Sequence, residues 1–248
     1  MASLRSWHKA ADGLLADLRA VLHTRLRSLV VYEAHGLLGD ASVTEDGGLQ
    51  RDNHVHTLAI VDNLSYSDLA QMAPLAANWA ERGLAVPLIL APDELRRSLD
   101  TFPLEFSQMI ARHVVIAGED PFKDLKVADA DLRRACESQV RSHLLHLREG
   151  FIQSAGNPEA LAALVSASVV PLRALLVNIA RLHGVNARTP DALTQFAEQQ
   201  LHLGTEGLRP LLSSRRPEQV RNLDVGAFFP AYLQAVEQLA ALVDEWTR

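Results

Sequence analysis

The chain has 248 residues, of which 48% are hydrophobic and 22% are charged, and its formal net charge is −6. This composition is typical of a water-soluble globular protein with one large or two modest domains, and the absence of a basic tail or stripe argues against nucleic acid as a partner. The single cysteine, Cys136, excludes an intramolecular disulfide and favours a cytoplasmic location.

The N-terminal segment predicts a helix rather than a signal peptide. Residues 3–27 carry apolar side chains at the spacing of one helix face, with charges throughout and no apolar h-region. The next residues, 28–32 (SLVVY), predict a strand. Residues 34–53 contain four glycines among polar residues and predict loops. No uninterrupted apolar run approaches ~20 residues, so we expect no membrane span.

A strand and a helix are predicted next. Residues 55–61 predict a strand, and residues 65–82 predict an amphipathic helix that Ser65 caps and Gly83 ends.

Two further strands are predicted, at residues 85–90 and 113–117, with a helix that opens at Pro92 between them. Pro87 argues against a fully paired central position for the first of these strands, because proline has no N–H to donate.

The second half of the chain predicts helices almost to its end. The predicted segments are 129–154, 157–183, 190–203 and 225–247, with a turn or short helix and a polar loop between 204 and 224. Asn157-Pro158 and Thr189-Pro190 are typical helix starts, and Pro171 predicts a kink. We therefore expect an α+β protein, with a small mixed β-sheet domain in residues 1–126 and a C-terminal helical bundle in residues 127–248.

This order of elements resembles the nucleotidyltransferase superfamily. The segments that carry the likeness are LRSLVVYEAHGLLGD (26–40), NHVHTLAIVDNLS (53–65), PLILAPDEL (87–95), TFPLEFSQM (101–109) and RHVVIAGEDPF (112–122). The layout is similar to that of kanamycin nucleotidyltransferase and of antitoxin-type minimal nucleotidyltransferases. The likeness covers the first half of the chain, and it extends to the second half only in helical character. It implies a phosphate-binding loop after the first strand and a Mg²⁺ site on the second.

The phosphate-binding loop departs from the family pattern. Active members end the first strand in Gly-Ser, whose backbone N–H groups and hydroxyl bind the triphosphate. Glu33 and Ala34 stand at those positions, with Gly36 close by. The glutamate adds a negative charge where phosphate would lie, and the alanine removes the hydroxyl. These three residues mark a degenerate cofactor-binding position.

The metal site departs from the pattern as well. Active members carry Asp-x-Asp on the second strand, where residues two apart share a face and both carboxylates can hold Mg²⁺. His54 and His56 stand there, and imidazole suits Zn²⁺ or Ni²⁺ better than Mg²⁺. A metal would need a third ligand, and the candidates are Glu33, His35, Asp52 and His113. Otherwise the two histidines are surface residues of a strand. The strand at 86–90, where many members have a third carboxylate, has none.

These departures favour a non-catalytic relative that keeps a binding or assembly role. We expect no resident cofactor and no Mg²⁺. The expected partners are a nucleotide or small molecule in the inter-domain cleft, a protein partner, or a second copy of the chain. The first alternative is a nucleotidyltransferase or hydrolase that uses His54, His56 and a transition metal such as Zn or Ni.

A second alternative is an antitoxin-like binding partner for a helical ribonuclease. A separate interpretation is that the C-terminal bundle itself is a ribonuclease domain, because Arg141 and His146 form an Arg-x4-His pair that is similar to a motif of helical ribonucleases. The chain has ten histidines, so such a pair arises easily by chance.

Overall fold

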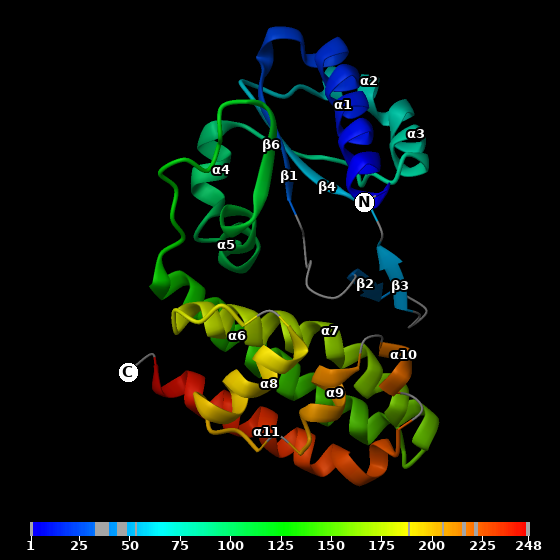
Figure 1. Ribbon diagram of the computed structural model, residues 1–248, viewed down its shortest axis with the longest axis vertical. Coiled ribbons are helices and arrows are strands. Elements are labelled where there is room, and N and C mark those ends of the chain that lie inside the picture. The colour runs from blue at the N-terminus through cyan, green and yellow to red at the C-terminus, as the bar shows by residue number, and fades with distance from the viewer. Residues whose placement is uncertain are drawn as a thin grey trace. The chain divides into compact units, whose positions relative to one another are not determined.

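The computed structural model describes residues 2–32, 40–43, 49–52, 54–187, 189–204, 206–214, 217–220 and 223–246, and only the backbone for 2–6, 40–43, 49–52 and 217–218. The chain divides into two compact units. The first contains residues 1–34 and 53–128, and the second contains residues 35–52 and 129–248. The predicted α+β class, a small mixed sheet followed by a helical part, is confirmed (Figure 1).

The sheet of the first unit has four strands in the order β5-β4-β1-β6. They are β1 (Leu26–Tyr32), β4 (His56–Val61), β5 (Leu88–Leu90) and β6 (His113–Gly118). β1 is antiparallel to both β4 and β6, and β5 is parallel to β4. The edge position of β5 confirms the expectation from Pro87.

Helices cover both faces of this sheet (Figure 1). On one side lie α1 (Ala2–Leu22), α2 (Tyr66–Met72) and α3 (Ala76–Glu81), and on the other lie α4 (Pro92–Ser98) and α5 (Pro103–Ala111). A 3₁₀ turn, His23–Arg25, joins α1 to β1. The core of the first side is built from buried residues of α1, the sheet and α3, among them Leu14, Leu18, Leu29, Ala59 and Trp79.

The prediction of one continuous helix over residues 65–82 is wrong, because the structure has two helices there. A 3₁₀ turn, Ala73–Leu75, separates α2 from α3. Pro74 lies in this turn, and a proline has no N–H to continue the α-helical ladder. Ser65 caps α2 as predicted, because its hydroxyl accepts a hydrogen bond from the N–H of Asp68 at 3.3 Å.

The prediction of loops throughout residues 34–53 is also wrong. Two short strands, β2 (Asp40–Val43) and β3 (Leu49–Asp52), pair antiparallel, with Asp40 opposite Asp52. The glycine content suggested irregular backbone, but Gly47-Gly48 between two short runs is also a hairpin signal.

The second unit contains the remaining helices. They are α6 (Asp129–Gln153), α7 (Pro158–Leu182), α8 (Pro190–Gln199), α9 (Arg209–Ser213), α10 (Pro217–Val220) and α11 (Val225–Glu245). The predicted caps are confirmed: the side chain of Asn157 accepts from the backbone of α7, and that of Thr189 accepts from the backbone of α8. α7 continues as helix through Pro171.

Helix α7 is the core of the second unit. Among the described residues it is the one helix whose length and mean hydropathy of 2.1 would fit a membrane span, and 61% of that stretch is buried inside the protein. It also carries buried polar residues, which are Ser166, Ser168, Arg173 and Asn178. Burial among neighbouring helices accounts for this apolar composition, as in the core helix of a water-soluble bundle.

Gly118 is required where β6 meets β1. Its φ is +77°, and a Cβ there would lie 1.9 Å from the carbonyl oxygen of Arg27. Gly83 has a similar φ of +76°, but a Cβ there would meet nothing within 4 Å. We therefore expect Gly118→Ala to lower the free energy of unfolding by about 2 kcal/mol more than Gly83→Ala does, since both substitutions strain φ and only the first creates a clash. Urea unfolding of the two variants measures the difference, and equal values would contradict it.

Candidate functional site

Three aromatic side chains form a row at the end of the sheet where β1 ends and where β4 and β6 begin. Tyr32 of β1 lies directly opposite His56 of β4 and directly opposite His113 of β6. Directly opposite residues of antiparallel strands project to the same face. The rings of Tyr32 and His56 are 6.0 Å apart. This is the end of the sheet where the nucleotidyltransferase resemblance places a metal and a phosphate loop.

Tyr32 is the centre of this row and is buried, with 9% of its surface exposed. Burial raises the pKa of its phenol. The hydroxyl therefore stays protonated at neutral pH. A neutral, buried ring between two histidines offers a contact surface, but it offers no charge with which to hold a cation.

His113 is held in place by its neighbours in α5 and in the loop after β6. Its Nδ1 lies 3.0 Å from the carbonyl oxygen of Met109, and its Nε2 lies 3.1 Å from Oδ1 of Asp120. Its ring also meets Phe122 edge-on at 4.8 Å. Both ring nitrogens therefore lie within hydrogen-bond distance of an oxygen. A ring in these contacts has no free nitrogen for a metal.

The structure does not bring His113 to His54 and His56 as a third ligand. β1 separates β4 from β6, so these two strands are two strand spacings or about 10 Å apart, and the ring of Tyr32 lies between them. Within the described ranges, no three His, Cys, Asp or Glu side chains gather in a group that could hold a metal ion.

Several predicted site residues are not tested by this geometry. Glu33, Ala34, His35 and Gly36 lie outside the described residues, and Asp52 is described only by its backbone. The degenerate phosphate loop and three of the proposed third ligands, Glu33, His35 and Asp52, therefore stay predictions.

Asp62, a further acidic residue of this strand region, lies at the other end of β4. Six strand residues separate it from the start of β4 at His56, a span of about 20 Å. Its carboxylate accepts a hydrogen bond from Nε of Arg27 at 2.5 Å. Asp62 is therefore a paired residue after the strand and not a displaced ligand for a metal at His54 and His56.

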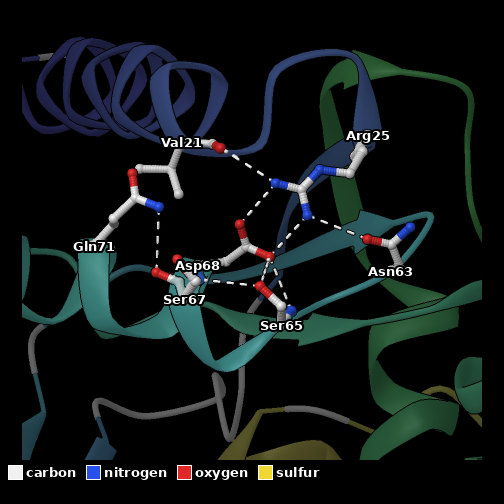
Figure 2. Close-up of polar contacts among 7 residues, drawn as sticks. All are labelled: Val21, Arg25, Asn63, Ser65, Ser67, Asp68 and Gln71. Carbon is white, nitrogen blue, oxygen red and sulfur yellow. Dashed lines mark hydrogen bonds and ion pairs between the residues drawn. The ribbon is translucent and has the colours of Figure 1, made fainter.

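An ion pair beyond the same end of β4 fixes the start of α2 (Figure 2). Arg25 donates from both terminal nitrogens to the two carboxylate oxygens of Asp68, at 2.7 Å each, and it also donates to the side chain of Asn63 at 3.2 Å. Asp68 accepts two more hydrogen bonds from Ser65, from its N–H at 2.9 Å and its hydroxyl at 2.7 Å. These bonds from Arg25 and Ser65 hold the pKa of the Asp68 carboxyl well below its usual value.

This ion pair joins the 3₁₀ turn before β1 to α2, the helix that follows β4. It therefore holds the start of β1 beside the end of β4. Ser65 and Asp68 form a capping box, and their spacing of three residues is a local signal in the sequence. Arg25 is 43 residues away from Asp68, and no local pattern connects them.

We expect Asp68→Asn to lower the melting temperature of the first unit at pH 7 by a few degrees. The amide keeps the shape but loses the charge that Arg25 requires. The pH dependence of stability follows from the lowered pKa of Asp68. The ionised carboxylate stabilises the fold fully above its ordinary pKa, and this stabilisation is lost as the pH falls toward the lower pKa of the folded state. Circular dichroism melts at pH 7 and pH 3 check this, because the difference between variant and wild type should shrink at pH 3. A constant difference would contradict it.

The Arg-x4-His pair on α6 is occupied by local contacts. Arg141 donates to Glu137 at 3.2 Å and to Asp244 of α11 at 2.7 Å. Nδ1 of His146 lies 2.7 Å from the carbonyl oxygen of Ser142. The bond to Asp244 ties α6 to α11, and His146 bonds within its own helical turn, so both residues have structural contacts.

No known protein-family model matches the chain, and no curated protein has significant sequence similarity to it.

Proposed function

We propose that this chain is a nucleotidyltransferase-like protein that has lost metal-dependent nucleotidyl transfer and keeps a binding or assembly role. The observation that carries the proposal is the row of Tyr32, His56 and His113. At the sheet end where the resemblance calls for paired carboxylates, the described strands present a neutral phenol and imidazoles.

The chemistry of this row supports binding rather than phosphoryl transfer. Nucleotidyl transfer needs Mg²⁺ to neutralise charge on the phosphates, and Mg²⁺ prefers hard oxygen ligands. A buried tyrosine between two histidines instead suits the face of a planar or apolar group. The expected ligand is a nucleotide or another small molecule. The expected assembly partner is another protein or a second copy of this chain. If the chain is antitoxin-like, the partner is a helical ribonuclease.

The test of the proposal is a transfer assay. The protein is incubated with radiolabelled ATP, Mg²⁺ and a panel of hydroxyl-bearing acceptors, including protein and RNA. We expect no transfer of label above the background of heat-inactivated protein. Label that depends on both protein and Mg²⁺, and that is lost in His56→Ala, would overturn the proposal.

Metal analysis separates this proposal from an enzyme with a remodelled site. We expect the untagged protein, purified without added metal, to contain less than about one tenth of an equivalent of Zn or Ni, because a histidine pair without a third ligand binds weakly. Elemental analysis by mass spectrometry measures this. A stoichiometric metal that disappears in His54→Ala, but not in the exposed-histidine control His202→Ala, would favour the enzyme.

We place the protein in the cytoplasm. Cys136 is fully buried, and burial raises the pKa of its thiol to about 12. A protonated, buried thiol is a packing residue, which is the ordinary state of cysteine in a reducing compartment.

A further inference from the structure

A second site lies in the first unit, at the opposite end of the sheet from the Tyr32 row. A hollow of about 630 Å³ opens between the start of β1, the end of β4, the start of α4 and the loop after β6. This volume lies within the range of small-molecule sites in proteins. Every residue that lines the hollow belongs to the first unit.

The floor of the hollow contains a buried hydroxyl. Ser28 lies directly opposite Ile60 on one neighbouring strand and directly opposite Gly118 on the other, and all three line the hollow. The side chains of Ser28 and Ile60 therefore project to the same face. Ser28 is 3% exposed, and its Oγ has no hydrogen-bond partner in the described part of the chain. A buried hydroxyl without a partner costs free energy that a ligand could recover.

The rim carries charges of both signs. Four of its groups already have partners. Arg27 is paired with Asp62, Arg96 is paired with Asp93, and Asp120 accepts hydrogen bonds from His113 and from the N–H of Phe122. The side chains of Lys123, Glu119 and Asp124 make no hydrogen bond or ion pair with the described residues, although Glu119 also interacts electrostatically with Arg27. One ammonium and two carboxylates are thus available beside the buried hydroxyl.

We propose that this hollow binds a small zwitterion with the chemistry of a free amino acid. The ligand carboxylate would face Lys123, its ammonium would face Glu119 or Asp124, and one of these two groups would bond the hydroxyl of Ser28. A polyphosphate fits less well, because the lining contains four carboxylates and only three cationic side chains. The excess negative charge would repel the phosphates. This proposal adds a ligand class and a place to the binding role, and it does not rest on the loss of nucleotidyl transfer.

The experiment uses the full chain and a panel of the free proteinogenic amino acids. Saturation-transfer NMR finds the binders, and calorimetry measures their affinity. We expect at least one free amino acid to bind saturably, and its N-acetyl and carboxamide derivatives to bind about tenfold more weakly, since each lacks one charge. Lys123→Ala should weaken binding to a similar extent, and Lys9→Ala, an exposed lysine of α1 in the same unit, should leave it unchanged.

Ser28→Ala separates binding from folding. Removal of a hydroxyl that has no partner should leave the urea midpoint of the free protein at or above that of wild type, while it weakens the amino acid's affinity. The proposal is overturned if no amino acid binds below about 10 mM. Equal affinity of wild type, Lys123→Ala and Ser28→Ala would overturn it too, as would tighter binding of ATP than of any amino acid at this site. The label-transfer assay is unaffected by any of these results, so the two proposals fail separately.

Discussion

Lowering the pH from 7 to 4 is expected to remove about 3 kcal/mol from the free energy of unfolding of the helical unit, through a single residue, His143. His143 lies on α6 and is 9% exposed. Burial lowers the pKa of its imidazole to about 4, and the nearby His146 adds a smaller effect in the same direction.

His143 belongs to a chain of hydrogen bonds that joins three helices inside the bundle. Nε2 of His143 lies 2.7 Å from the hydroxyl oxygen of Tyr232 on α11. Tyr232 donates to Oγ of Ser168 on α7 at 2.9 Å, and Ser168 donates to the carbonyl oxygen of Val165 at 2.7 Å. Because the tyrosine proton points to Ser168, Nε2 of His143 must donate to Tyr232, which fits a neutral ring with its proton on Nε2.

The sign and the pH window follow from the lowered pKa. The unfolded chain takes up the proton near pH 6.5, and the folded chain resists protonation until about pH 4. Stability is therefore complete above pH 6.5, and it is lost as pH falls from 6.5 to 4. This difference in pKa between the unfolded and folded states corresponds to a loss of ~3 kcal/mol in the free energy of unfolding between pH 7 and 4.

Hydrogen exchange of the α6 and α11 amides measures this loss in the helical unit alone, which matters because a two-unit protein has no single melting point. In His143→Gln the amide still donates to Tyr232 but does not titrate, so most of the loss between pH 7 and 4 should disappear. His146→Gln, an exposed position one turn further along α6, should keep most of the loss. If wild type and His143→Gln lost the same free energy between pH 7 and 4, the proton uptake would belong to other groups.

Local signals in the sequence were sufficient for most of the elements. Asn157 and Thr189 were identified as caps because each precedes a proline, and the structure gives both side chains the expected hydrogen bonds. Pro87 placed β5 at an edge for a similarly local reason. The hairpin of β2 and β3 was missed because a four-residue strand has too few residues to show alternation, and the glycines outweighed it.

The contacts that organise the sites could not be predicted, because they join residues far apart in sequence. Tyr232 is 89 residues from His143 and 64 residues from Ser168. The alignment of Tyr32 with both His56 and His113 depends on strand order and register, which the sequence leaves open. For the metal hypothesis at His54 and His56, this register decides only that His113 is not the third ligand.

Arg173 is a buried cation of α7 that hydrogen-bonds the C-terminal end of α9. Its substitution is expected to lower the free energy of unfolding about as much as the protonation of His143 does. It is 4% exposed, and one of its terminal nitrogens donates to the carbonyl oxygens of Leu211 at 2.6 Å, of Leu212 at 2.9 Å and of Ser214. These are orphan carbonyls at the C-terminal end of α9, where a positive charge also meets the negative end of the helix dipole. Burial lowers the pKa of this guanidinium to about 10, so it remains charged at neutral pH.

Arg173→Met should therefore lower the free energy of unfolding of the helical unit by about 3 kcal/mol, because it leaves three buried carbonyls without a donor. Arg173→Lys should recover only part of this loss, since the ammonium sits on a shorter side chain and cannot reach the position of the Arg173 terminal nitrogen that makes all three bonds. The matched control is Arg209→Met at the start of α9, whose exposed ion pair with Glu198 should contribute less than about 1 kcal/mol. Hydrogen exchange of the α7 and α11 amides at pH 7 measures all three variants. A value for Arg173→Met within about 0.5 kcal/mol of Arg209→Met would show that water replaces the guanidinium and that α9 ends without it.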